Sequence, residues 1–448
     1  MIFPYLPHTE EEIQEMLSEI GVRSIDDLFS DIPEKIRFND SIELPSGVTE
    51  MEAFRQLQQL ADANSQAVSF LGGGSYDHYI PSTVGAITGR TEFYTSYTPY
   101  QPEISQGVLQ AIFEFQTMMC QLTGLEAPNA SLYDGSTAVS EACALAINGT
   151  KKTDTILYSS SIHPFTKEVL KTYFSDLGVT LKEIPAGDNG PDIETVKKEL
   201  TPSVAGLLVQ TPNVFGHLED YTGLADLLHE NKSLLIVSAN PMSLGVLKSQ
   251  KEWGADIAIG DTQPFGLPSY YGGPSVGYIV ADRSLMRKMP GRIVGQTVDR
   301  DGERVFVLTL QAREQHIKRE RATSNICSNQ ALAALATTVY LATVGKEGLK
   351  EIAALNAQKA HYLYERLTAE LPVKPYLQAP FFNEFTLKLP QKAEDVVAAM
   401  EKEGFFAGVP LQHLDPSQDP NLLAVAVTEK RTKEEMDRYV ESMKGVLK

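Results

Sequence analysis

Short apolar runs alternate with amphipathic segments through the middle of the chain. Strands that alternate with helices in this way pair in parallel, because each helix carries the chain back across the sheet before the next strand begins. Continuous apolar runs such as GLLVQ and LLIV suit strands that are buried on both faces. An α/β domain with a mostly parallel sheet is therefore predicted. The expected strands are 155–159, 180–184, 205–210, 234–237, 256–259 and 277–280, and the expected helices are 164–174, 193–200 and 224–230.

The two ends of the chain follow other patterns. Near the N-terminus, two apolar helical faces are preceded by a hydroxyl residue and a glutamate three positions apart, which is the capping-box signal of a helix start. These pairs are Thr9 with Glu12 and Thr49 with Glu52. From Asn329 onward, two long helical patterns lead into short strands and helices of a small α+β domain. We predict an N-terminal helical arm over 1–70, a large α/β domain over 71–345 and a small C-terminal α+β domain over 346–448.

Composition narrows the classes of partner. The 448 residues carry a formal net charge of −19, which disfavours nucleic acid and anionic membrane surfaces. No apolar run reaches the roughly 20 residues that a membrane span needs, and the acidic start MIFPYLPHTEEEI is unlike a signal peptide. Cys120, Cys143 and Cys327 lack the spacing of metal ligands, so no metal is expected. They are predicted to be buried thiols in helical segments, in a reducing cytoplasm.

The stretch FYTSYTPYQPEISQG, residues 93–107, is predicted to be irregular. Its two prolines lack a backbone N–H and fix φ, which excludes a helix interior or a central strand. A phenol ring offers rigid apolar area with a polar tip, which suits the wall of a site or an interface. A loop that packs only on its own domain remains the alternative. The stretch contains Tyr94, Tyr97 and Tyr100, and it ends at Ser105, the predicted N-cap of a long helix.

Several polar groups follow the predicted strands, at the edge where open parallel sheets bind ligands. Gly135, Ser136 and Thr137 begin a helix whose N–H groups and hydroxyls suit a phosphate, and an ordinary helix cap explains them equally well. His163 follows a strand, where its ring either stacks on a flat cofactor or caps the next helix. The run DTQPF and a glycine-rich turn at 271–274 follow a later strand.

This order of strand ends resembles the large domain of pyridoxal-phosphate-dependent transferases of the aspartate aminotransferase-like fold, fold type I. The resemblance implies an Asp beside the ring nitrogen and a lysine that forms the Schiff base before the glycine-rich turn. Here Gln263 stands in place of that lysine, and residues 234–240 contain no Asp. A carboxamide cannot form an imine, and without an acidic partner the ring is a poor electron sink. The chain is predicted to keep the fold without binding the cofactor covalently.

Longer motifs make the resemblance specific. The chain resembles glycine decarboxylase, the P-protein family of the glycine cleavage system, in SYTPYQPEISQG, FQTMMCQLTG, NASLYDGSTAVSEA, QPFGLPSYYGGP, RATSNICSNQAL and the opening YLPHTEEEIQEMLSEIGVRSIDDLFSDIP. The likeness covers nearly the whole chain and is to subunit 1, the α subunit or N-terminal-half type of the two-chain form. In that family the Schiff-base lysine belongs to subunit 2, which agrees with Gln263 here.

The resemblance implies a function and a set of partners. With subunit 2, the chain would decarboxylate glycine and transfer the aminomethyl group to the lipoyl group of H-protein, releasing CO2 in glycine catabolism. The implied assembly is a cytoplasmic α2β2 heterotetramer that acts with lipoylated H-protein. Pyridoxal phosphate would be held by the partner subunit, with none covalently bound to this chain.

The resemblance also implies that this chain supplies part of the wall of a site shared with subunit 2. The expected wall residues are Tyr94, Tyr97, Tyr100, Gln101, Glu103 and Ser105. The expected vestigial cofactor site comprises Gly135, Ser136, Thr137 and His163, with Gln263 in place of lysine. Arg321, Thr323, Ser324 and Asn325 form a second candidate cluster, in which a surface charge is the alternative role of Arg321.

Three other functions remain open. A self-sufficient pyridoxal-phosphate enzyme would need another lysine, and Lys248 and Lys251 are the nearest upstream of Gln263. A structural pseudoenzyme would leave its partner active without it. A Rossmann dehydrogenase is disfavoured because the chain lacks the G-x-G-x-x-G fingerprint.

Overall fold

The structure is a computed structural model that describes Tyr5, Asp40 and residues 7–38, 42–152, 154–270 and 273–447. The chain forms two compact units, Met1–Ser65 and Gln66–Lys448, which are described separately. Tyr271 and Gly272, which belong to the glycine-rich turn expected at 271–274, lie outside the described residues.

The N-terminal unit is helical, as predicted, and both capping boxes are present. The Thr9 hydroxyl accepts the Glu12 N–H at 3.2 Å, and the Thr49 hydroxyl accepts the Glu52 N–H at 3.3 Å. Among the described residues of this unit, Leu17 alone is buried. The unit therefore leaves most of its apolar side chains exposed. Its helices are α1 (Glu10–Ile20), η1 (Ile25–Phe29), η2 (Glu34–Ile36) and α2 (Glu50–Asp62).

A seven-stranded sheet forms the centre of the second unit, with the strand order β2-β10-β9-β8-β7-β3-β4. The strands from β9 to β4 are parallel, as predicted. β10 departs from the expected pairing and runs antiparallel to both β9 and β2, because the described residues between β9 and β10 form no helix. The strands are β2 (Ala127–Pro128), β3 (Thr155–Ser159), β4 (Thr180–Ile184), β7 (Val204–Thr211), β8 (Leu234–Ala239), β9 (Ile257–Asp261) and β10 (Gly277–Ala281).

Helices cover both faces of this sheet, because its central strands are apolar on both faces. Successive side chains of a strand point to opposite faces, so Leu208 packs in the core beside α6 and Leu207 packs in the core beside α9. Ala142 and Ala146 give α6 a narrow surface that lies close to the strands. The covering helices are α6 (Gly135–Thr150), α7 (Pro164–Phe174), α8 (Ile193–Glu199) and α9 (Leu224–Glu230).

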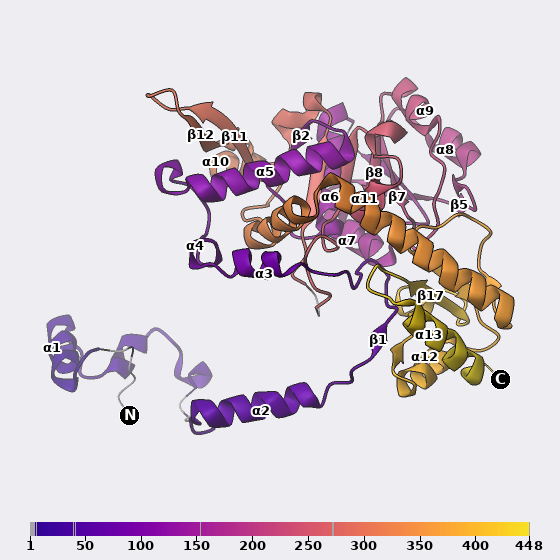
Figure 1. Cartoon of the computed structure of the whole chain (residues 1–448). Coiled ribbons are helices and arrows are strands. Elements are labelled where there is room, and N and C mark those ends of the chain that lie inside the picture. Colours follow the sequence, from indigo (N-terminus) through magenta and orange to yellow (C-terminus); the bar gives the residue numbers. More distant parts are fainter. Residues whose placement is uncertain are drawn as a thin grey trace. The chain divides into compact units, whose positions relative to one another are not determined.

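The long helix α11 (Ala331–Glu370) runs from the region of the large sheet to the C-terminal region, where α12 and α13 lie (Figure 1). Gly345 interrupts it with a φ of +64°, between the two helical patterns expected from the sequence. The C-terminal sheet has the order β13-β14-β17-β16. The division into three domains remains a proposal. The C-terminal elements are β13 (Lys374–Pro375), β14 (Glu384–Lys388), α12 (Ala393–Lys402), β15 (Phe405–Phe406), β16 (Val409–Pro410), η9 (Leu411–His413), β17 (Leu422–Ala426) and α13 (Lys433–Val446).

Short elements complete the second unit. β1 pairs in parallel with β15, and β11 and β12 form an antiparallel hairpin. No helix in the part of the chain that the structure describes is long and apolar enough to cross a bilayer. The remaining elements are β1 (Val68–Ser69), α3 (Ser82–Thr88), α4 (Thr91–Tyr94), η3 (Pro102–Ile104), α5 (Gln106–Thr123), β5 (Ala186–Gly187), β6 (Gly190–Pro191), η4 (Pro241–Gly245), η5 (Lys251–Trp253), η6 (Arg283–Lys288), β11 (Ile293–Val298), β12 (Arg304–Thr309), η7 (Gln311–Arg313), α10 (Gln315–Lys318) and η8 (Arg319–Arg321).

Ser105 stands at the N-cap of α5, as predicted, although its side chain makes no capping hydrogen bond. The prediction for Cys327 is wrong, because this residue is exposed and lies outside any helix, in the segment between η8 and α11. The other thiols lie in helices, where burial raises the pKa of Cys143 to about 12 and that of Cys120 to about 11.

Candidate functional site

A cavity of about 270 Å³ opens at the carboxyl ends of the parallel strands, at the edge where the sequence predicts a ligand site. Gln210, Ser238 and Asp261 line it from β7, β8 and β9. Gly135 and Ser136 of α6, His163 and residues 73–76 also line it. Of the predicted vestigial cofactor residues, Gly135, Ser136 and His163 therefore lie around one cavity, whereas Thr137 and Gln263 are not among the described residues that line it.

The first turn of α6 is already hydrogen-bonded by side chains of this chain. Asp134 is the N-cap, and its Oδ1 accepts the Thr137 N–H at 2.7 Å. The Gly135 N–H donates to Oδ2 of Asp261 at 2.8 Å. A phosphate at this helix end would compete with both carboxylates for the same donors.

Asp261, at the end of β9, was singled out by no sequence pattern, although it belongs to the DTQPF run. Its carboxylate also accepts the Gln263 N–H at 2.8 Å and the Ser275 hydroxyl at 2.5 Å. Desolvation by the surrounding protein raises the pKa of Asp261, and these hydrogen bonds oppose that shift. The side chain ties the end of β9 to the start of α6 and to the turn before β10.

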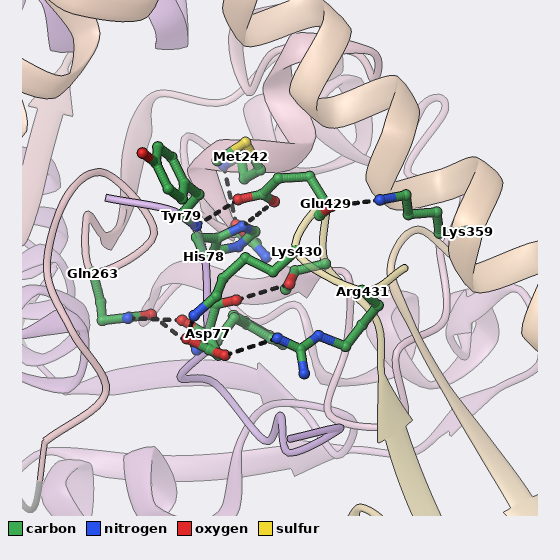
Figure 2. A network of polar contacts seen from close by, with 12 residues as sticks. Asp77, His78, Tyr79, Met242, Gln263, Lys359, Glu429, Lys430 and Arg431 are labelled. Atoms are coloured by element: carbon green, nitrogen blue, oxygen red, sulfur yellow. Dashed lines mark hydrogen bonds and ion pairs between the residues drawn. The ribbon is translucent and has the colours of Figure 1, made fainter. Parts of the chain in front are cut away.

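Gln263 is 4% exposed, and both ends of its carboxamide are hydrogen-bonded (Figure 2). Its Oε1 accepts the Tyr76 N–H at 2.9 Å. Its Nε2 donates to the carbonyl oxygens of Tyr76 and Leu267, each at 2.9 Å. Gln263 therefore holds residues 72–79, which we call the connecting segment, against the edge of the sheet.

His163 caps α7, which is one of the two roles predicted for it. Its Nδ1 accepts the Phe165 N–H at 3.2 Å, and its Nε2 lies 3.0 Å from the carbonyl oxygen of Gly73. Since the carbonyl only accepts, Nε2 carries the proton. Burial lowers the pKa of His163, which favours this neutral form. Beside it, the hydroxyls of Ser136 and Thr166 lie 2.9 Å apart.

The connecting segment also bonds the C-terminal region. Oε1 and Oε2 of the buried Glu384 accept the Gly73 N–H at 2.7 Å and the Tyr76 hydroxyl at 2.9 Å. Figure 2 shows further contacts, in which Glu429 and a pair of cations face residues 77–79. These contacts are His78 with Glu429 at 2.8 Å, the Tyr79 N–H with Glu429 at 2.6 Å, and Asp77 with Lys430 at 2.6 Å and Arg431 at 3.3 Å. The connecting segment, which borders the cavity, is therefore hydrogen-bonded both to Gln263 and to the C-terminal region.

These residues do not fit pyridoxal phosphate. The Gly135 and Thr137 N–H groups are bound by carboxylates of this chain. None of the described residues that line the cavity is a lysine or an arginine. At the end of β8, where the ring nitrogen would need an acid, the chain has Ser238, Ala239 and Asn240. The site therefore offers neither a nucleophile for the aldehyde nor a cation for the phosphate.

The tyrosine loop, residues 94–105, is largely exposed to solvent. The exposed fractions are 67% for Tyr94, 78% for Tyr97 and 54% for Tyr100. Gln101 and Glu103 are exposed as well, and Ser105 is half-buried. The middle of the loop is irregular, as predicted, with single helical turns at its two ends.

The tyrosine loop meets two stretches that are distant in the sequence. The Tyr97 hydroxyl lies 3.1 Å from Oγ of Ser328, in the segment that follows the second candidate cluster. The Tyr100 hydroxyl accepts from Nη2 of Arg292 at 3.3 Å, and this guanidinium lies 5.6 Å from the centre of the Tyr100 ring. Both phenols are therefore oriented by polar side chains of this chain.

Arg292 contacts the tyrosine loop, which the sequence does not reveal. Its side chain is buried, with Nε 3.9 Å from Glu314 and Nη1 3.4 Å from Oδ1 of Asn329. A lone arginine in the run PGRIVG has the pattern of a surface charge, and only the fold brings it under Tyr100.

The residues of the second candidate cluster, 321–325, do not form one site. Arg321 is exposed beside Glu320, which is the surface-charge role. Thr323 and Asn325 are exposed, whereas Oγ of Ser324 donates to the buried Glu141 of α6 at 3.0 Å. In the described part of the chain, no three His, Cys, Asp or Glu side chains are grouped so that they could hold a metal.

Comparison with known proteins identifies the family to which this chain belongs. The family model described as glycine cleavage system P-protein matches residues 4–443. A protein of Geobacillus thermodenitrificans named probable glycine dehydrogenase (decarboxylating) subunit 1 is 51% identical over 446 residues, covering 99% of each chain.

Solved structures agree with the sequence comparison. A crystal structure of glycine decarboxylase, the P-protein of the glycine cleavage system, in inhibitor-bound form has a TM-score of 0.90 and 42% identity, covering 99% of this chain and 100% of that chain. A sphingosine-1-phosphate lyase of Burkholderia pseudomallei has a TM-score of 0.65 at 15% identity, covering 92% of this chain and 94% of that chain. The second likeness bears on the fold alone. The predicted fold class, that of fold type I pyridoxal-phosphate-dependent enzymes, is confirmed.

Proposed function

This chain belongs to the glycine cleavage system P-protein family, and from that premise we propose that it is subunit 1 of a cytoplasmic glycine decarboxylase. With subunit 2 it decarboxylates glycine and passes the aminomethyl group to the lipoyl group of H-protein. The observation that carries this proposal is the 51% identity to a subunit 1 over 99% of both chains. A match of that extent covers nearly the whole chain.

The proposal assigns pyridoxal phosphate to subunit 2. When bound there, the cofactor supplies the electron sink that allows glycine to lose its carboxylate. Gln263 and Asp261 support this assignment, because the first provides no amine and the second occupies a donor that a phosphate would need. Lys248 lies over the Trp253 ring at 4.2 Å, and neither it nor Lys251 is among the residues that line the cavity.

The tyrosine loop is proposed to form part of the wall of the site in subunit 2. Rings that are more than half exposed contribute little to the core of their own unit, whereas at an interface they would exclude water. Arg292 and Ser328 hold the phenols in place before the partner binds. The chain would therefore position groups around the substrate and take no covalent part in the reaction.

We predict that the chain and subunit 2 form an α2β2 complex. The N-terminal unit exposes Phe38, Phe54, Leu57 and Leu60 by more than 65% each, and apolar surface of this kind favours association with a partner. Size-exclusion chromatography with light scattering, at micromolar concentration, should give one peak with the mass of two copies of each subunit. Two separate peaks with the masses of the free subunits would contradict the prediction.

The proposed activity is tested by exchange of label between bicarbonate and the carboxyl group of glycine. The chain co-purified with subunit 2, in the presence of lipoylated H-protein, should exchange label, and each subunit alone should not. Exchange by subunit 2 alone at the rate of the pair would make this chain a structural partner. Exchange by this chain alone would make it a self-sufficient enzyme, so either result would reject the proposal.

A further inference from the structure

We infer that Asp261 is an internal anion that takes the place of a phosphate group at the start of α6, and that its carboxylate keeps phosphate-bearing ligands out of the cavity. The inference deepens the proposed division of labour between the subunits and rests on it for its functional meaning. The exclusion itself is a property of this chain alone and can be measured without subunit 2.

The first backbone donor of α6 is directed at Asp261. The Gly135 N–H lies 2.8 Å from Oδ2 of Asp261. A Cβ placed on Gly135 would be 3.1 Å from the Asp261 Cβ, so the aspartate side chain packs directly against the first residue of the helix. A phosphate oxygen that accepted this N–H would need the space that the carboxylate oxygen fills. The two anions therefore exclude each other at this donor.

Electrostatic repulsion disfavours a phosphate at this helix end, in addition to the steric exclusion. The N-terminus of a helix carries a partial positive charge that favours an anion. Asp261 and the N-cap Asp134 both direct carboxylate oxygens at the first turn of α6. No lysine or arginine is found among the described residues that line the cavity. A phosphate dianion would meet two carboxylates without a compensating cation, and like charges at this distance repel each other.

The hydrogen bonds hold Asp261 in this place and favour its ionised form, against the burial that raises its pKa. Besides Gly135, its close partners are the Gln263 N–H and the Ser275 hydroxyl, at 2.8 Å and 2.5 Å. Backbone N–H groups can only donate, and a carboxylate that only accepts is satisfied in its ionised form. The internal anion is therefore preformed, before any ligand approaches.

The test measures binding of pyridoxine 5′-phosphate to the full chain by equilibrium dialysis. This probe lacks the aldehyde, so it cannot label surface lysines, and pyridoxine without phosphate serves as the comparator. The wild-type chain should show no saturable site. Asp261→Ser frees the Gly135 N–H and should bind one phosphate ester per chain, at least about tenfold tighter than any residual binding by the wild-type chain. Asp261→Asn keeps the shape and removes the charge, so it should gain less, and pyridoxine should gain nothing.

Asp256→Asn is the matched control. Asp256 precedes the same strand at the opposite edge of the sheet, and its Oδ2 accepts the Leu235 N–H at 2.8 Å. This change also neutralises a carboxylate that bonds a backbone N–H, but away from the cavity, so it should leave binding unchanged.

Two results would overturn the inference. One is a saturable single site for the phosphate ester in the wild-type chain. The other is a folded Asp261 variant that binds no better than wild type, and the isosteric Asn variant decides this if the Ser variant does not fold. A failure of glycine–bicarbonate exchange in the assembled enzyme would reject the proposed function and leave this binding result intact.

Discussion

Tyr100→Phe and Tyr97→Phe are each expected to slow glycine–bicarbonate exchange by the assembled enzyme about ten- to a hundred-fold. Each change removes one hydroxyl and keeps the ring, so the packing of the loop should survive. The loss of one positioning hydrogen bond in a site closed to water costs about 1–3 kcal/mol. The complex should still elute from a sizing column as the wild-type assembly does.

The structure gives a reason to expect this effect from the tyrosine hydroxyls rather than from the aromatic rings. Tyr97 and Tyr100 are 78% and 54% exposed, so their rings contribute little to the stability of this chain. Their hydroxyls are nevertheless oriented, by Ser328 at 3.1 Å and by Arg292 at 3.3 Å. An exposed ring with an anchored hydroxyl is suited to meet a partner in a defined orientation.

Two controls separate positioning from packing. Ser328→Ala removes the anchor of Tyr97 but keeps the phenol, so exchange should fall less than in Tyr97→Phe. Tyr376→Phe makes the same chemical change in the C-terminal region and should have no effect on exchange. Wild-type kinetics in both loop variants would contradict the prediction and show that these tyrosines serve only to pack.

The elements that the sequence predicts well are those encoded locally. α7 and α9 have the predicted bounds, 164–174 and 224–230, because Pro164 begins α7, Gly223 precedes α9 and each helix carries an apolar face. The continuous apolar run at 205–210 lies within β7 (Val204–Thr211), which is buried on both faces. The apolar run at 277–280 does not indicate the direction of its strand. The described residues between β9 and β10 form no helix, and β10 runs antiparallel to β9.

Contacts between distant residues could not be predicted. Gly135 and Asp261 are 126 positions apart, and Tyr100 and Arg292 are 192 positions apart. A charged residue at the end of a strand has the same local pattern whether it faces water, a ligand or another strand end. The order of motifs predicts that Gln263 stands in the lysine position, but its partner Tyr76 follows only from the fold.

Gln263→Lys is expected to destabilise the chain by about 2–4 kcal/mol and to restore no cofactor chemistry. The change removes the acceptor of the buried Tyr76 N–H, because an ammonium group can only donate. It also places an ammonium group where the wild-type side chain is 4% exposed. Urea-induced unfolding of the full chain measures the loss. Gln263→Met, which removes the carboxamide without adding a charge, is the matched control and should lose no more than the lysine variant.

The same variant tests whether a lysine alone can rebuild the cofactor site. After incubation with pyridoxal phosphate, dialysis, borohydride reduction and digestion, label should be scattered over surface lysines, as in the wild-type chain. The introduced amine would still face a helix end whose first donor is held by Asp261, and β8 would still end in Ser238, Ala239 and Asn240 with no acid for the ring nitrogen. Stoichiometric label on the introduced lysine, together with release of CO2 from glycine by this chain alone, would contradict the prediction. It would show that the wild-type chain lacks cofactor chemistry only because it lacks this amine. Unfolding at the wild-type urea concentration would show that the Gln263 carboxamide does not hold the connecting segment.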